Sequence, residues 1–304
     1  FAQVSNPPLD AIREELVTSL EGWAGSGHNI FDEVPEHCNQ LRLRHPILDN
    51  QQMGKIRHID RGNVRSTTIS TLFDIANGKG SLQTALESLC KDVSYAVDQG
   101  YSIIILSDRG VDSSHAAIPS LLATSSVHHH LIREGTRMKV GLVIESGEPR
   151  EVMHFSLLIG YGAAAINPYL IFDVLTSSIG DKVLPNTVAP KDAQTNIIKA
   201  LDKGILKVMS KMGISTVQSY RGAQIFEAVG LNADLVEKHF TWTTSRIQGV
   251  GIDAIEQESL QRHSFGFDDN IWGNLDLDIG GVYQWRKDGE YHMVNPESIS
   301  LLQH

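Results

Sequence analysis

The first group of side chains that could carry chemistry is Ser107-Asp108-Arg109, which directly follows an apolar run from Tyr101 to Leu106 (YSIIIL). Such a run predicts a strand buried on both faces, and parallel α/β proteins gather their active sites where such strands end. A carboxylate beside a guanidinium could contact a substrate or a phosphate. The pair could instead fix a loop, with Asp108 accepting hydrogen bonds from nearby amides, and we favour this second interpretation.

A second group of charged side chains surrounds the segment Ile214 to Ser219, which we predict to be a strand. Lys207 and Lys211 lie on the preceding helix, and Arg221 follows the segment in a turn with Gly222. These cations could meet an anionic ligand, or they could pair with acidic neighbours. The residues alone leave the choice open.

Two glycines flank Tyr161 in the stretch Gly160-Tyr161-Gly162-Ala163. A phosphate-binding loop needs its glycines between a strand and the start of a helix, where backbone amides point at the anion. Here the order is reversed, because the glycines follow a predicted helix and precede a predicted strand. We therefore interpret them as a helix C-cap and a tight turn.

Three consecutive histidines, His128 to His130, raise the question of a metal site. Adjacent residues on a helix point in different directions, whereas zinc sites use histidines three or four positions apart, so we do not favour a metal here. The two cysteines, Cys38 and Cys90, are too few for an iron–sulfur cluster. No GxSxG nucleophile elbow occurs either.

Strand and helix patterns alternate from Thr67 to about Arg262, and this alternation has to position the groups above. The predicted elements include a helix from Ser81, buried strands at Tyr101 to Leu106 and Lys139 to Ile144, and a long helix from Asp192 to Met212. Repeated βα units predict a mostly parallel sheet with helices outside it. The repeat is shorter than a complete eight-unit barrel, so we expect an α/β fold that is a partial or degenerate (βα) barrel or an open sheet.

Composition narrows the class of protein further. The 304 residues carry a formal net charge of −10, which argues against nucleic acid as a partner because phosphate binding needs a basic surface. No apolar run is long enough to predict a membrane span, and no signal peptide is visible. The chain begins with Phe1 and ends in the middle of a helical pattern, so we expect it to be part of a longer polypeptide.

Six segments, in the same order, resemble the central domain of glutamate synthases. The stretch from Gly204 to Gly230 is the most distinctive of them. The others are Phe1 to Leu20, Arg44 to Leu48, Leu106 to Arg109, His154 to Leu170, and Gly289 to Pro296.

The resemblance implies a role that the residues alone do not reveal. Glutamate synthases make two glutamates from glutamine and 2-oxoglutarate with electrons from ferredoxin or a reduced nicotinamide. Their central domain resembles the flavin domain in topology and binds no flavin. It links the glutaminase and flavin domains and helps to form an ammonia tunnel. By this resemblance we expect no cofactor here, FMN and an iron–sulfur cluster in the flavin domain, an inactive isolated chain, and a location in the cytoplasm or a plastid stroma.

The resemblance also implies residues for the tunnel or a domain interface. His28, Asn29 and Ile30 match a stretch associated with the tunnel wall. Thr18 stands where family members commonly have methionine, which would change a contact with the flavin region. Arg221 is expected near a domain interface. The glycine-rich segment 22–30 offers the small, uncharged groups that a water-excluding wall needs, although a surface loop has the same composition.

We thus expect an N-terminal extension (1–66) packed on a βα core (67–262), and a C-terminal extension (263–304) leading toward the flavin domain. One alternative is a free-standing (βα)-barrel enzyme that binds an anionic metabolite at Asp108, Arg109 and Arg221. The other is a zinc enzyme that uses His128 to His130.

Overall fold

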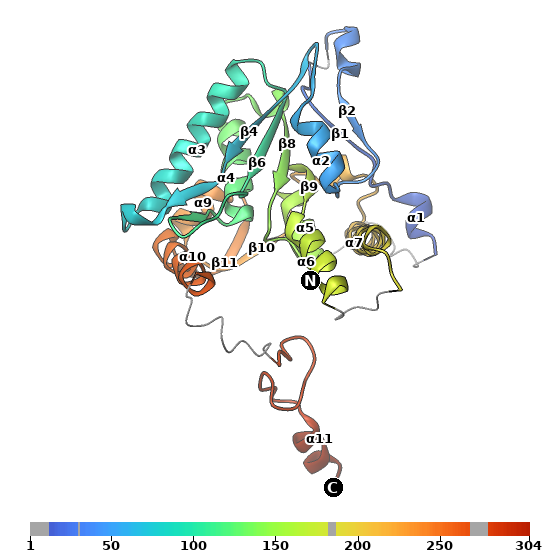
Figure 1. Cartoon of the computed structure of the whole chain (residues 1–304), viewed down its shortest axis with the longest axis vertical. Coiled ribbons are helices and arrows are strands. Elements are labelled where there is room, and N and C mark those ends of the chain that lie inside the picture. Colours follow the sequence, from blue (N-terminus) through green and yellow to red (C-terminus); the bar gives the residue numbers. More distant parts are fainter. Residues whose placement is uncertain (1–11, 30, 182–186, 268–278) are drawn as a thin grey trace. The chain divides into compact units, whose positions relative to one another are not determined.

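The computed structural model describes residues 12–29, 31–181, 187–267 and 279–304 (Figure 1). Two compact units divide the chain, Phe1–Gln261 and Arg262–His304. In the second unit the residues from 279 onward form turns and one helix, α11 (Pro296–Gln303), whose first turn is capped by the side chain of Asn295.

A five-stranded sheet is the centre of the first unit. Its strand order is β3-β4-β6-β8-β9, and the last four strands run parallel while β3 runs antiparallel to β4. The strands are β3 (Asp60–Arg61), β4 (Val64–Ser70), β6 (Ile103–Ser107), β8 (Gly141–Glu145) and β9 (Ala163–Asn167). Every residue of β6, β8 and β9 is buried, which the apolar runs predicted for β6 and β8.

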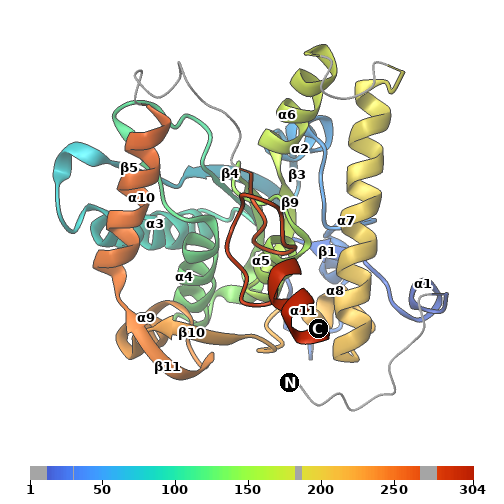
Figure 2. The ribbon, with the colours of Figure 1, turned by 90° about the horizontal axis from the view of Figure 1, so that it is seen from below.

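Several long helices cover one face of the sheet, and one shorter helix with a β-hairpin covers the other (Figure 2). Ile104 and Leu106 pack in the larger core cluster, to which α3, α4, α5 and α7 contribute. Ile103 and Ile105 pack in a smaller cluster with α2 and the β1–β2 hairpin. Alternate residues of one strand thus enter two cores, which explains why its sequence is apolar throughout. The bounds are α2 (Asn50–Arg57), α3 (Ser81–Asp98), α4 (Ser120–Arg133), α5 (Val152–Gly160), α7 (Pro190–Met212), β1 (Gly22–Ala24) and β2 (Leu41–Leu43).

The sheet is open in the described part of the chain, so the expected α/β fold with a partial, mostly parallel sheet is confirmed. The outer edge of β9 meets Ile47 at a single bridge instead of pairing with a further strand. The strand pair β10 (Glu227–Leu231) and β11 (Thr244–Val250) forms a separate parallel sheet, and α9 (Ala233–His239) connects the two strands.

The strand predicted for Ile214 to Ser219 is wrong. Only Thr216 forms a bridge, with Ser19, and the chain then enters a short helix, α8 (Val217–Tyr220), whose N-cap is Thr216. The physical reason is composition, because most side chains between Ser215 and Ser219 are polar and could not fill a position buried on both faces.

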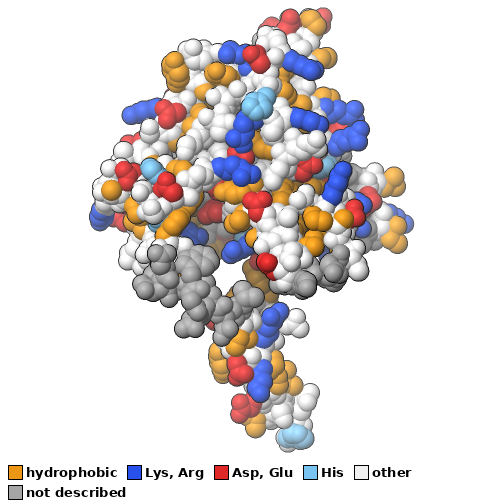
Figure 3. Space-filling model, viewed as in Figure 1, with side chains coloured by type: hydrophobic (Ala, Val, Ile, Leu, Met, Phe, Trp, Pro, Cys, Tyr) orange, Lys and Arg blue, Asp and Glu red, His pale blue; other side chains and the backbone are white. Residues whose placement is uncertain are grey.

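The remaining elements are short or lie outside the sheet. The helices are α1 (Glu14–Val17), α6 (Tyr169–Gly180) and α10 (Ile252–Gly266), the strands are β5 (Leu72–Asp74) and β7 (His115–Ala117), and the 3-10 turns are Pro35–Cys38, Ile75–Asn77 and Arg137–Lys139. None of the described helices combines the length and the apolar character needed to cross a membrane. Acidic and basic side chains lie interspersed on the face shown in Figure 3.

Candidate functional site

The carboxyl edge of the sheet holds Asp108, and its carboxylate is fully engaged by the protein itself. It accepts hydrogen bonds from the Ser146 hydroxyl at 2.6 Å, the Tyr169 hydroxyl at 2.8 Å and the Gly147 amide at 3.1 Å. Burial raises the pKa of Asp108, and these hydrogen bonds act in the opposite direction. Asp108 therefore joins three segments of this edge.

The neighbouring Arg109 is also engaged internally. Its Nε donates to Oε1 of the buried Glu145 at 2.7 Å, and its guanidinium lies 4.0 Å from the centre of the Tyr169 ring. Glu145 also accepts from Arg57 Nη2 at 2.5 Å and from the Ser107 hydroxyl at 2.5 Å. These contacts favour the loop-fixing interpretation of the Asp108-Arg109 pair over a ligand site.

We expect the substitution Glu145→Gln to lower the free energy of unfolding by about 2–4 kcal/mol, because it leaves two guanidinium groups without their shared counter-charge. Urea denaturation of the wild-type and variant chains measures the difference. Glu237→Gln, at an exposed position on α9, is the matched control and should change stability by less than about 0.5 kcal/mol. Equal stabilities for Glu145→Gln and the wild type would contradict the structural role.

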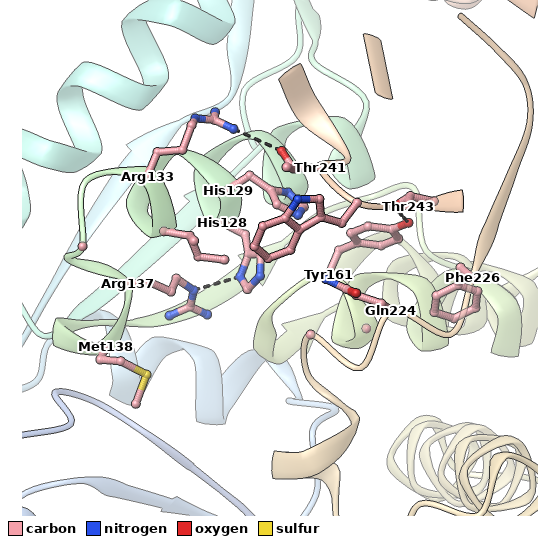
Figure 4. A pocket seen from close by; sticks show the side chains of 15 residues that line it. His128, His129, Arg133, Arg137, Met138, Tyr161, Gln224, Phe226, Thr241 and Thr243 are labelled. Carbon is pink, nitrogen blue, oxygen red and sulfur yellow. Dashed lines mark hydrogen bonds between the residues drawn. The ribbon is translucent and has the colours of Figure 1, made fainter. Parts of the chain in front are cut away.

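A cavity of about 520 Å³ lies near the amino ends of β8 and β9, at the opposite edge from Asp108. We call it the arginine cavity. Four segments line it: the last two turns of α4 with the residues that follow them to 138, the turn 160–161, the stretch 222–226, and residues 241–243 (Figure 4). Tyr161 is fixed in its wall by a 2.7 Å hydrogen bond between its hydroxyl and that of Thr243, and by an edge-on contact with Phe240.

The two glycines flanking Tyr161 permit close contacts in the wall of this cavity. Gly162 has a φ of +109°, and a Cβ at this position would lie 2.3 Å from Nδ1 of His128. A Cβ at Gly160 would lie 2.6 Å from the ring of Phe226. The predicted C-cap and tight turn are present, because α5 ends at Gly160 and β9 begins at Ala163. The structure adds that both glycines are needed for side-chain packing.

The histidines of α4 are held by different partners. His128 Nδ1 accepts from Arg137 Nε at 2.9 Å, and His129 Nδ1 donates to the Ser125 carbonyl at 2.9 Å. Burial, with the nearby charge of Arg137, lowers the pKa of His128 to about 3. Burial also lowers the pKa of His129. Both rings are therefore neutral at neutral pH, and His130 faces Ser94 and Glu134 instead. The described residues contain no group of three or more metal-ligating side chains.

Arg137 is the central cation of the cavity. Its Nη1 and Nη2 donate to the carbonyls of Val140 and Gly162, at 2.7 and 2.8 Å. Burial and the charge of Arg221 lower the pKa of Arg137 to about 10, so it stays charged at neutral pH. Sequence reasoning missed both Arg137 and Arg133. The available signal for Arg133 was its position four residues after His129, on the same face of α4.

Arg221 does not join Asp108 and Arg109. Its Nη2 donates to the Trp23 carbonyl at 3.1 Å, and Gly222 binds the carbonyl of Gly160, so this segment lies at the amino end of β9. Asp108 lies at the carboxyl ends of the strands, about 16 Å away along a five-residue strand. The structure thus separates the three residues that the anionic-metabolite alternative requires.

The other residues proposed for a tunnel or interface lie in the N-terminal segment. Thr18 is buried beside α1, whereas Asn29 is exposed and accepts a hydrogen bond from the amide of Phe31. The ring of His28 meets that of His37 edge-on at 5.7 Å. Ile30 lies outside the described residues.

Comparison with known proteins identifies relatives over the full length of the chain. A model of the family described as glutamate synthase central domain matches residues 1–232. The large chain of the NADPH glutamate synthase of Bacillus subtilis (strain 168) is 42% identical over 303 residues, which are 100% of this chain and 19% of that protein. The chloroplastic/mitochondrial ferredoxin-dependent glutamate synthase 1 of Arabidopsis thaliana is 38% identical, over 99% of this chain and 19% of that protein.

The chain therefore spans about a fifth of the length of these relatives. Among solved structures, a flavocytochrome b2 variant overlaps 81% of this chain and 47% of its own, with 14% identity and a TM-score of 0.39. That score is too low to support an inference about this chain.

Proposed function

The chain belongs to the glutamate synthase central-domain family, and from this premise we propose that it is the cofactor-free domain that links the glutaminase and flavin domains of a glutamate synthase. In this role it helps to form the internal path along which ammonia travels from one active site to the other. The observation that carries the proposal is the 42% identity over the full chain to a relative of which this chain spans 19%.

The hydrogen-bond partners of the polar groups at the carboxyl edge of the sheet support a linking role over a catalytic one. A parallel α/β enzyme keeps its catalytic groups at the carboxyl edge of the sheet. In this chain the carboxylates at that edge, Asp108 and Glu145, are hydrogen-bonded to neighbouring side chains of the protein. Side chains that are engaged in this way are poor candidates for binding a substrate. We accordingly assign no catalytic residue to this chain.

The segment proposed for the tunnel wall packs directly on the sheet. A Cβ at Gly141, the first residue of β8, would lie 2.8 Å from the amide nitrogen of Gly25, so the two backbones are in close contact. The amide of Gly27 donates to the Met138 carbonyl at 2.6 Å. A segment held in this way offers a fixed surface of backbone and small side chains, which suits a path that excludes water.

The rest of the proposal concerns the whole enzyme. One active site hydrolyses glutamine to glutamate and ammonia, and the other reductively aminates 2-oxoglutarate to a second glutamate. FMN and an iron–sulfur cluster of the flavin domain would supply the electrons, and ferredoxin or a reduced-nicotinamide-linked subunit would be their source. We infer a cytoplasmic location, or a plastid one if the source is a plant.

We expect His28→Trp, in a full-length glutamate synthase that contains this chain, to uncouple the two half-reactions. A bulky ring in the tunnel wall would block ammonia, so the glutamate formed per glutamine hydrolysed should fall from two toward one while free ammonia appears in solution. Parallel assays of glutamine hydrolysis, glutamate formation and ammonia release measure this ratio.

The matched control is His58→Trp, at an exposed position after α2 and outside the segment 22–30. It should leave the ratio at two. If His28→Trp still formed two glutamates per glutamine hydrolysed, the tunnel role of this segment would be refuted. An indole ring in the tunnel wall should narrow the path enough to slow the passage of ammonia.

A further inference from the structure

The arginine cavity carries positive charge without a counter-charge. Arg133 and Arg137 both line it, and none of the described residues that line it is Asp or Glu. Neither arginine forms an ion pair with a carboxylate in the described part of the chain, and the nearby charge that acts on Arg137 is that of Arg221. Guanidinium groups in a lining without carboxylates favour an anionic occupant.

Both arginines also have N–H donors that form no hydrogen bond within the described part of the chain. A guanidinium group has five N–H donors. Arg137 uses three of them, for His128 and the carbonyls of Val140 and Gly162. Arg133 uses one, for the hydroxyl of Thr241 at 3.2 Å. Guanidinium groups fixed by such contacts can bind a carboxylate or phosphate with the donors that remain.

Aromatic side chains form much of the remaining wall. Tyr161 and Phe226 are stacked with their ring centres 6.1 Å apart, and Tyr161 also lies beside His129 at 6.3 Å (Figure 4). Trp242 lines the same cavity although 77% of it is exposed. An aromatic wall next to cationic groups suits a flat ring that carries a negative group.

Backbone strain is concentrated at this cavity. Three described residues other than glycine have a positive φ, and two of them, Gln224 at +54° and Trp242 at +65°, line the cavity. Such conformations cost free energy and are typical of ligand-binding segments. The ring of Trp242 is mostly exposed to solvent. Packing of this ring in the protein core therefore does not offset the free energy that the strained backbone costs.

We propose that the arginine cavity is a binding site for a small molecule that has an aromatic or heterocyclic ring and one phosphate or carboxylate group. The ring packs against the aromatic wall, and the anionic group binds the unused donors of Arg133, beside Thr241. The volume of about 520 Å³ fits a ligand of this size. This site is separate from the linking role proposed above and does not depend on it.

Isothermal titration calorimetry of the 304-residue chain with AMP and with indoleacetate tests the proposal. At least one of the two should bind saturably, and the better one shows which combination of ring and anionic group the cavity prefers. Adenosine has the ring without the charge, and inorganic phosphate has the charge without the ring, so both should bind at least about tenfold more weakly. The proposal is overturned if neither AMP nor indoleacetate gives saturable heat up to about 10 mM, or if a half-ligand binds as tightly as the whole.

Two variants separate ligand contact from folding. Arg133→Gln removes a charge from a group with one hydrogen bond, and Trp242→Gly removes the ring at a φ that glycine tolerates. Each should weaken binding about tenfold or more while the thermal unfolding temperature changes little. Arg246→Gln, on β11 outside the cavity, is the matched control and should bind like the wild type. Binding that survives both cavity substitutions would place the ligand elsewhere.

Discussion

Replacing Gly162 with alanine is expected to lower the free energy of unfolding by about 3 kcal/mol or more, through two independent effects. The first effect is backbone strain, since the residue has a φ of +109°. The second is a clash, because the new Cβ would lie 2.3 Å from Nδ1 of His128. His128 cannot move aside without losing its hydrogen bond from Arg137. Chemical denaturation of the purified variant measures the loss.

A double-mutant cycle separates the two effects of this substitution. His128→Ala makes space for the methyl group, so the additional cost of Gly162→Ala should be smaller in the His128→Ala background than in the wild type. The strain would remain. Gly54→Ala, inside α2, is the matched control, because a Cβ at that position would have no atom within 4 Å other than those of its own helix backbone and chain neighbours. It should stabilise the chain by about 0.5–1 kcal/mol. A wild-type stability for Gly162→Ala would show that the turn does not hold His128 as described.

Acid is expected to destabilise the chain well before most carboxylates titrate. Burial lowers the pKa of His128 to about 3 and that of His239 to about 4. In the unfolded chain a histidine has a pKa of about 6.5. As the pH falls below that value, the unfolded state binds protons that the folded state does not, so the unfolding free energy decreases. This contribution is complete above about pH 6.5 and is lost as the pH falls toward the folded pKa values.

The expected loss is large. At about pH 5 each of the two histidines should lower the free energy of unfolding by about 2 kcal/mol relative to neutral pH, or by about 4 kcal/mol together. Urea denaturation at several pH values between about 7 and 5 measures the slope. The pair of substitutions His128→Gln and His239→Asn should flatten it, since each replacement is a neutral side chain that can still form a hydrogen bond, with Arg137 and Ser126 respectively. His58→Gln, at an exposed position, should leave the slope unchanged. A variant pair as acid-sensitive as the wild type would contradict the assignment.

The charged pair at the end of β6 shows what can be predicted about two residues from the sequence and what depends on the fold. The sequence predicted where Asp108 and Arg109 lie, and it favoured a loop-fixing role over a ligand contact. The choice depended on Glu145 and Tyr169, which reach the pair from other parts of the chain. Whether a carboxylate is available to a ligand is decided by these distant partners. For Arg221 the prediction of a preceding strand was wrong, and the residue lies at the other edge of the sheet.

Elements with local patterns could be predicted from the order of residues alone. Continuous apolar runs gave the buried strands β6 and β8, and helical periodicity with a final glycine gave α3, because these signals depend on residues only a few positions apart. The similarity of the full chain to glutamate synthases is likewise a property of residue order. That Arg133, Tyr161 and Trp242 line one cavity could not be predicted in this way. They lie on segments far apart in the chain, and the packing of those segments follows from the folding of the whole core, which no local pattern encodes.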